Sequence, residues 1–172
     1  TVDLGTGITA KAIQAGNDHT CAILDNSSVK CWGYNASGQL GLGHTNNRGD
    51  DSNQMGENLT TVDLGSGRTA MAIAAGGNHT CAILDNSSAV MCWGKNDQGQ
   101  LGLGNTTDSL NASVVDMGSG ITAKAIAAGE SHTCAILNNS SIKCWGRANE
   151  GQMGLIKSDN NIGDVSGEMG VE

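Results

Sequence analysis

Short apolar runs separated by turn residues recur along the chain and predict β-strands. The run at residues 10–16 is followed by HTCAIL at residues 19–24 and by VKCWG at residues 29–33. Each run is short and ends at Gly or at polar turn residues, which is typical of strands rather than helices. We expect residues 10–16 to form a strand buried on both faces. Residues 19–33 should form a hairpin, with its turn at residues 25–28.

This pattern is written three times along the chain. The equivalent residues Val2, Val62 and Val115 open successive copies at spacings of 60 and 53 residues, so the repeats are 1–60, 61–113 and 114–172. We expect the TVDLG-type segment before each copy to supply a fourth strand, and the glycines of GQLGLG to make tight returns. Four short strands per 53–60 residues, with one Trp and several Gly, are typical of a propeller blade. The sequence predicts an all-β chain of three tandem β-propeller blades, each with four short antiparallel strands.

Three blades are too few to close a ring, because closed propellers hold about four to eight. The ending GEMGVE also resembles QMGENL, the segment that precedes the second repeat. We interpret the chain as one period of a longer tandem array, or as a protomer whose end meets the beginning of another; the alternative is a natural terminus at Glu172. The sequence therefore predicts an incomplete propeller that needs further repeats or other chains to cover its end blades.

The repeated motif reads Ala-Gly, two residues, His-Thr, a turn, Trp-Gly, then Asn, two residues and Gly-Gln-Leu-Gly. Over nearly the whole chain it resembles the regulator of chromosome condensation repeat family. The resemblance implies a seven-bladed β-propeller fold; the family includes the propeller-type β-lactamase inhibitor protein, and its members bind quite different proteins. Two departures are Asn-Ser-Ser in the hairpin, where the family usually has Asp-Gly-Ser, and the absence of proline. The resemblance implies a fold and does not by itself assign a function.

Six cysteines occur as one pair per repeat, on the two strands of each predicted hairpin. The pairs are Cys21 with Cys31, Cys81 with Cys92, and Cys134 with Cys144. Neighbouring strands bring such residues within disulfide reach, and an even count in matching pairs favours disulfides in an oxidising compartment. Buried free thiols and a zinc site are the alternatives. Ala89 lengthens the middle hairpin by one residue, and we expect a bulge to absorb it.

Asn-X-Ser/Thr sequons are unusually dense, at nine positions where chance would give about three. Three of them fall in the same predicted hairpin turn, where an exposed tip can carry a sugar. Asn78 lies too close to a strand, and Asn138 overlaps the next sequon. An alternative explanation is that Asn and Ser are simply good turn residues. We predict N-glycans at Asn26, Asn86, Asn139, Asn35, Asn58, Asn105 and Asn111.

Histidine and tryptophan also recur once per repeat, which argues for an architectural role. A site that occurs at the same position in every blade would be scattered around the propeller. We expect the histidines to make structural hydrogen bonds and the tryptophans to fill the core between blades. These residues are His19, His79, His132, Trp32, Trp93 and Trp145.

Composition narrows the classes of function. The formal net charge of −8 and the pI near 4.7 disfavour contact with phosphate backbones, so we expect no nucleic-acid partner. The apolar runs fall far short of the roughly 20 residues of a membrane span. No nucleophile elbow, phosphate loop or paired acid and base carboxylates emerge, so we expect a non-enzyme without a cofactor. Calcium is the one metal that the variable loops would suit, although a solvated acidic loop is the main interpretation. The loop oxygens belong to Asp50, Asp51, Asp159, Asn161 and Asp164.

Together these features predict an extracellular or cell-surface structural glycoprotein. Its blades would join head to tail, through self-association of identical chains or further repeats, into a fibre or surface appendage. The alternative is a closed propeller that binds a partner protein, as an inhibitor or adhesion module, through its variable loops at residues 44–58 and 157–168. Guanine-nucleotide exchange, implied by the founding member of the family, fits poorly with sequons and paired cysteines.

Overall fold

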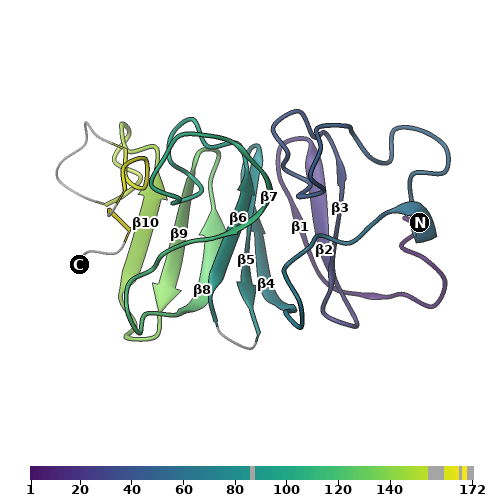
Figure 1. Cartoon of the computed structure of the whole chain (residues 1–172), viewed down its shortest axis with the longest axis horizontal. Coiled ribbons are helices and arrows are strands. Elements are labelled where there is room, and N and C mark those ends of the chain that lie inside the picture. The colour runs from purple at the N-terminus through teal and green to yellow at the C-terminus, as the bar shows by residue number, and fades with distance from the viewer. Residues whose placement is uncertain (86–87, 155–160, 167, 170–172) are drawn as a thin grey trace.

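The computed structural model describes residues 1–85, 88–154, 161–166 and 168–169. Within them, three antiparallel β-sheets stand side by side along the long axis of the molecule (Figure 1). This confirms the predicted all-β blades of an incomplete propeller. A 3-10 turn, η1 (Gly56–Asn58), lies beside the first sheet, and no helix in the described part of the chain is long and apolar enough to cross a bilayer.

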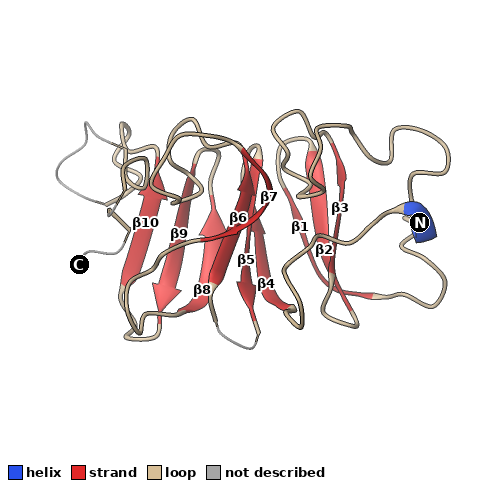
Figure 2. Ribbon diagram, in the orientation of Figure 1, coloured by secondary structure: helices blue, strands red, loops and turns tan. Residues whose placement is uncertain are grey.

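The strands have the lengths that the apolar runs predict, and Figure 2 shows the loops that connect them. The first sheet contains β1 (Ala10–Ala15), β2 (His19–Leu24) and β3 (Val29–Gly33). The second contains β4 (Ala70–Ala75), β5 (His79–Leu84), β6 (Val90–Gly94) and β7 (Ser109–Val114). The third contains β8 (Ala123–Ala128), β9 (His132–Leu137) and β10 (Ile142–Gly146).

Each sheet has two different faces, because side chains alternate along a strand. In the first sheet Cys21 pairs with Cys31, and Thr20 pairs with Trp32. We call the face with the paired cysteines the cysteine face and the opposite one the tryptophan face. The cysteine face of each blade packs against the tryptophan face of the next, and this contact forms two apolar cores. Burial of each large side chain in these cores stabilises the stack by about 1.5–3 kcal/mol.

The fourth strand does not come from the TVDLG segment, as the sequence led us to expect. In the second sheet it is β7, which belongs to the loop after GQLGLG. At this place the described residues of the other two sheets form single bridges, Gly33 with Arg48 and Gly146 with Ile162. The TVDLG segment lies between blades instead: Val62 is buried in the first core, and its N–H donates to the carbonyl of Val29 at 2.8 Å.

The prediction that residues 10–16 form a strand buried on both faces is wrong. Every residue of β1 is exposed. For Ile13, which pairs with Ala22 on the tryptophan face, the reason is that no blade in the described part of the chain covers this face. The equivalent β4, which packs against the first blade, is largely buried.

The extra residue in the second hairpin is absorbed by its turn rather than by a bulge in the paired strands. Ile83 pairs with Val90 in the register in which Ile23 pairs with Val29. The turn is closed by Ala89, whose carbonyl accepts from the N–H of Leu84 at 2.9 Å. The cysteines therefore keep their pairing despite the insertion.

Candidate binding face and the blade junctions

The loops that connect the strands lie at two opposite ends of the sheets, and the two sets of loops differ. At one end lie the hairpin turns, such as residues 25–28, beside the pair Ala10 and Leu24. At the other end lie the loops that follow Gly33, Gly94 and Gly146, beside the starts of β2, β5 and β9. We call these the hairpin end and the loop end. The repeated sequence builds the strands, whereas the loop end carries the segments that differ between copies.

At the loop end, the residue after each Trp-Gly pair takes the same backbone position in all three blades. The N–H of Tyr34 donates to the carbonyl of Asp18 at 2.8 Å. Lys95 and Arg147 make the equivalent bonds, to Asn78 at 2.8 Å and Ser131 at 2.9 Å. The preceding glycine is required here: Gly33 has φ +106°, and a Cβ on it would lie 2.4 Å from the oxygen of Asp18.

The side chains at these three positions differ in chemistry. Tyr34 is 46% exposed, Lys95 pairs with Asp97 at 3.0 Å, and Arg147 lies 3.8 Å from Glu150. We call these three residues the row at Tyr34; the sequence analysis did not predict it. The signal that could have found it is a variable residue directly after an invariant Trp-Gly.

The loop after the first hairpin is organised by Asn35. Its Nδ2 donates to the carbonyls of His44 (2.7 Å) and Asn46 (3.0 Å), and its Oδ1 accepts from the N–H of Leu40 at 2.9 Å. Asn96 makes the equivalent bonds in the second blade. In the third blade the buried residue at this position is Ala148. These asparagines fix the loops through buried hydrogen bonds.

The predicted glycan at Asn35 is wrong for the folded blade, because this side chain is fully buried and its Nδ2 is already engaged. Asn26 and Asn139 are exposed at the hairpin end, and the Oδ1 of each accepts from a serine hydroxyl at 2.7 Å. Asn86 lies outside the described residues. Asn58, Asn105 and Asn111 are exposed, and Asn105 donates its Nδ2 to the carbonyl of Leu103. Glycosylation at the exposed sites stays a prediction.

Two of the three repeated histidines connect one blade to the next. The Nε2 of His19 lies 2.9 Å from the hydroxyl of Thr80, which donates its single proton to the carbonyl of Gln39 at 2.9 Å. The hydroxyl must therefore accept from the histidine N–H. His79 and Thr133 repeat this contact at 2.9 Å. Burial lowers the pKa of His19 to about 4 and that of His79 to about 3, so both rings are neutral at pH 7.

The burial of each tryptophan depends on whether a preceding blade covers its face. Trp93 is fully buried in the first core, and its Nε1 donates to the carbonyl of Gln39 at 3.0 Å. Trp145 is fully buried in the second core. Trp32 lies on the free tryptophan face of the first blade and is only half-buried.

All three predicted cysteine pairs are disulfide-bonded. Cys21–Cys31 and Cys81–Cys92 are fully buried between blades, whereas Cys134–Cys144 lies half-buried on the free cysteine face of the third blade. Such bonds fit an oxidising compartment.

The solvated acidic loop stays a prediction, and calcium stays its alternative. No cluster of three His, Cys, Asp or Glu residues that could hold a metal occurs in the part of the chain that the structure describes. Asp159 falls outside that part. Asn161 is engaged in holding the loop, because its Nδ2 donates to Gln98 at 3.2 Å. Burial, and then the neighbouring Glu168, raise the pKa of Asp164.

The Ala-Gly, His-Thr, Trp-Gly and Gly-Gln positions of the repeated motif coincide with a known repeat. The regulator of chromosome condensation (RCC1) repeat matches residues 10–39, 72–100 and 123–152. The chain belongs to this family. A second form of the RCC1 repeat matches residues 28–83 and 89–136, and so spans from one blade into the next.

Several known proteins are similar to this chain. The ultraviolet-B receptor UVR8 of Arabidopsis thaliana is 32% identical over 150 residues, which cover 87% of this chain and 32% of the receptor. The probable E3 ubiquitin-protein ligase HERC4 of Homo sapiens is 33% identical over 150 residues, which cover 87% of this chain and 13% of HERC4. In fold, the chain resembles Prp20p of Saccharomyces cerevisiae with a TM-score of 0.74 and 19% identity, over 91% of this chain and 37% of Prp20p. The chain thus spans less than half the length of each of these proteins.

Proposed function

We propose that these RCC1 blades form a non-enzymatic protein-binding module that recognises its partner through the loop end. The observation that carries the proposal is the row of Tyr34, Lys95 and Arg147. Equivalent backbone bonds, one in each blade, hold three chemically different side chains at the loop end, and all three are at least partly exposed to solvent. Tyr and Arg are enriched at the centres of protein interfaces, and loops on a rigid scaffold are common recognition sites.

The relatives support binding rather than a shared reaction. A receptor and a probable ubiquitin ligase are each similar to this chain over 150 residues but differ in the activity that their names give. The repeat is the part that this chain shares with both. Its role here is therefore to present a surface, and the variable loops decide which protein is bound.

A photo-crosslinking residue placed at position 34 tests this proposal in the cells that produce the chain. We expect crosslinks of defined mass at position 34 and none when the same residue replaces Asn26, which is exposed at the hairpin end. Substitution Arg147→Glu should remove the crosslinked species and leave thermal unfolding unchanged. Equal crosslinking at both positions, or none at position 34, would contradict recognition through the loop end.

A second candidate is an extracellular glycoprotein, and the hairpin end favours it. Asn26 and Asn139 occupy equivalent exposed turns in which a serine hydroxyl contacts the asparagine Oδ1, and the three disulfides suit secretion. The similarities found favour a binding module over the fibre that we predicted. Intact mass before and after glycosidase treatment tests the glycans, and an unmodified mass would remove this candidate.

A further inference from the structure

The two junctions inside the molecule are built from the same backbone bonds. In each, two N–H groups of one blade donate to carbonyls in the hairpin of the preceding blade. The bonds run from Val62 to Val29 (2.8 Å), from Ala70 to Ser27 (2.8 Å), from Val115 to Val90 (2.9 Å) and from Ala123 to Ser88 (3.0 Å). A further bond links the turns before the histidines: Asn17 donates to Gly77 at 3.2 Å, and Gly77 donates to Glu130 at 3.0 Å. The junction is therefore a repeated interface with a fixed set of donors and acceptors.

The tryptophan face of the first blade and the cysteine face of the third blade are not covered by another blade in the described structure. Each of these free faces carries the groups that form one side of such a junction. On the first blade, Val2 and Ala10 carry the equivalent N–H groups, and Thr20 and Trp32 stand where Thr80 and Trp93 stand in the second. On the third blade, Ser140 and Ile142 carry the equivalent carbonyls, and His132 and Gln152 stand where His19 and Gln39 stand in the first. Among the described residues, His132 has no threonine hydroxyl within hydrogen-bond distance.

The apolar positions of these faces are exposed in the same complementary way. On the first blade Val2 is 51% and Ile13 61% exposed, whereas their equivalents Val62 and Ile73 are 5% and 6% exposed. On the third blade Ile142 is 69% exposed, whereas its equivalent Val90 is fully buried. Exposed apolar patches of this kind mark interaction sites.

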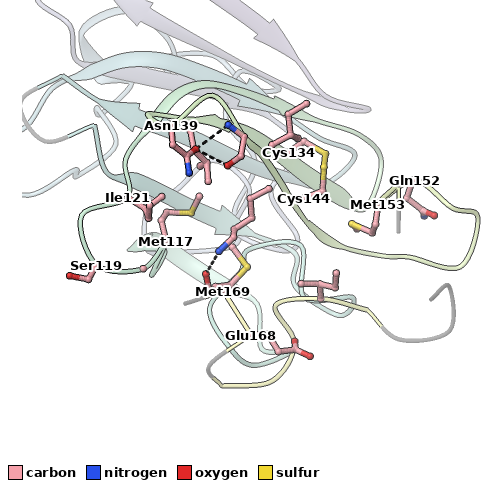
Figure 3. A pocket seen from close by; sticks show the side chains of 17 residues that line it. Met117, Ser119, Ile121, Cys134, Asn139, Cys144, Gln152, Met153, Glu168 and Met169 are labelled. Atoms are coloured by element: carbon pink, nitrogen blue, oxygen red, sulfur yellow. Dashed lines mark hydrogen bonds between the residues drawn. A yellow bond between two sulfur atoms is a disulfide. The ribbon is translucent and has the colours of Figure 1, made fainter. Parts of the chain in front are cut away.

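A hollow of about 1190 Å³ lies against the third blade, close to its free cysteine face. In Figure 3 the Cys134–Cys144 disulfide and Met153 lie on one side of it, and Met117 and Met169 on the other. Gly154 also lines it. A Cβ on the equivalent Gly41 would meet Trp93 and Val62 of the next blade within 3.0 Å, whereas no atom of the described residues lies within 4 Å of such a Cβ on Gly154. The hollow thus includes the place where a following blade would insert its tryptophan and valine.

We infer that the free cysteine face of the third blade binds the free tryptophan face of the first blade in a second copy of this chain. The contact repeats the internal junctions: Thr20 of the second copy bridges His132 and the carbonyl of Gln152, and Trp32 and Val2 fill the hollow. Because the two faces differ, the copies meet head to tail and not through a two-fold axis. The junction does not include the side chains of Tyr34, Lys95 or Arg147, so it does not depend on the proposed partner binding.

The test uses two charge substitutions at exposed positions, one on each face of the 172-residue chain. Ile142→Asp blocks the cysteine face, and Ile13→Asp blocks the tryptophan face. Sedimentation velocity of the wild-type chain up to about 100 µM should show association that grows with concentration. Each variant alone should associate at least about tenfold more weakly, because the junction would bury an unpaired carboxylate. The matched control is Met71→Asp, at an apolar residue that is 50% exposed on the middle blade; it should behave as wild type.

Mixing the two variants gives the sharpest readout. Each keeps one intact face, so a head-to-tail contact predicts a 1:1 complex that does not grow further. Circular dichroism of each variant checks that the blades stay folded. A wild-type chain that remains monomeric over the whole range overturns the inference. So does a mixture that forms no complex, or a control that weakens association as much as the other two substitutions.

Discussion

The middle blade and the end blades carry the same motif but bury it differently. Val90 of the middle blade is fully buried and its equivalent Ile142 is 69% exposed; Ile73 is 6% exposed and its equivalent Ile13 is 61% exposed. Strand formation is therefore a property of each repeat, whereas burial is a property of its neighbours, as in other stacked repeat proteins. The energetic role of a repeated residue depends on its place in the stack.

The largest expected difference between a covered and a free blade face is the loss of stability when its tryptophan is replaced by alanine. Trp93→Ala should lower the free energy of unfolding by about 3–5 kcal/mol, because it leaves a cavity in the first core. Trp32→Ala should cost about 1 kcal/mol or less, since its side chain is only half-buried in a single chain. Urea unfolding at low protein concentration measures both. Equal losses would show that the free face is already covered in solution.

Next in size is a pH effect from the junction histidines. Their folded pKa values, about 4 for His19 and about 3 for His79, lie below the ordinary value of 6.5. The unfolded chain therefore binds more protons in this window, and stability is lost as the pH falls from about 6.5 toward these values. The loss at pH 4 relative to pH 7 should be on the order of 3 kcal/mol for each ring.

Substitution His79→Asn isolates this contribution. Urea unfolding at pH 4 and pH 7 should show a smaller pH-dependent loss than in the wild-type chain, by about the amount of one ring. An unchanged pH dependence would mean that the junction does not hold His79 in its neutral form.

The three disulfides should be reduced at different rates, because they differ in their exposure to solvent. Mild reductant under native conditions should open Cys134–Cys144 roughly tenfold faster than the other two bonds, which are fully buried and need local unfolding to react. Alkylation followed by peptide mass spectrometry reads out each pair. Simultaneous reduction of all three would contradict the difference between end and middle blades.

The smallest effect is expected at the hairpin end. Asn26→Gln and Asn139→Gln should each remove one glycan mass and change the free energy of unfolding by less than about 0.5 kcal/mol, because both residues are exposed. Mass spectrometry and thermal unfolding of material from a secreting host measure the two quantities. An unaltered mass in both variants would contradict glycosylation at these turns.

The hairpins and the cysteine pairs could be predicted because local patterns specify them: short apolar runs, turn residues and equal spacing in every copy. The fourth strand could not, since β7 lies in a loop whose sequence differs between repeats, and it forms where that loop meets β6. Exposure of Ile13 depends on a missing neighbouring blade, which no local sequence pattern encodes. Asn35 matches a sequon, which led to the prediction of a glycan. A sequon is defined by three residues and does not show that neighbouring carbonyls already bind the side-chain amide. The row at Tyr34 escaped notice because its members share a position and not a residue type.

The cysteines of each disulfide face one another directly across the strand ladder, as Cys81 faces Cys92. A slip of one residue would turn one cysteine to the opposite face of the sheet, so the bond can close only in the native register. The two partners are only 10 or 11 positions apart in the sequence, and each bond stays within one hairpin. Each disulfide can therefore form as soon as its own hairpin has folded, and none has to wait for a distant part of the chain.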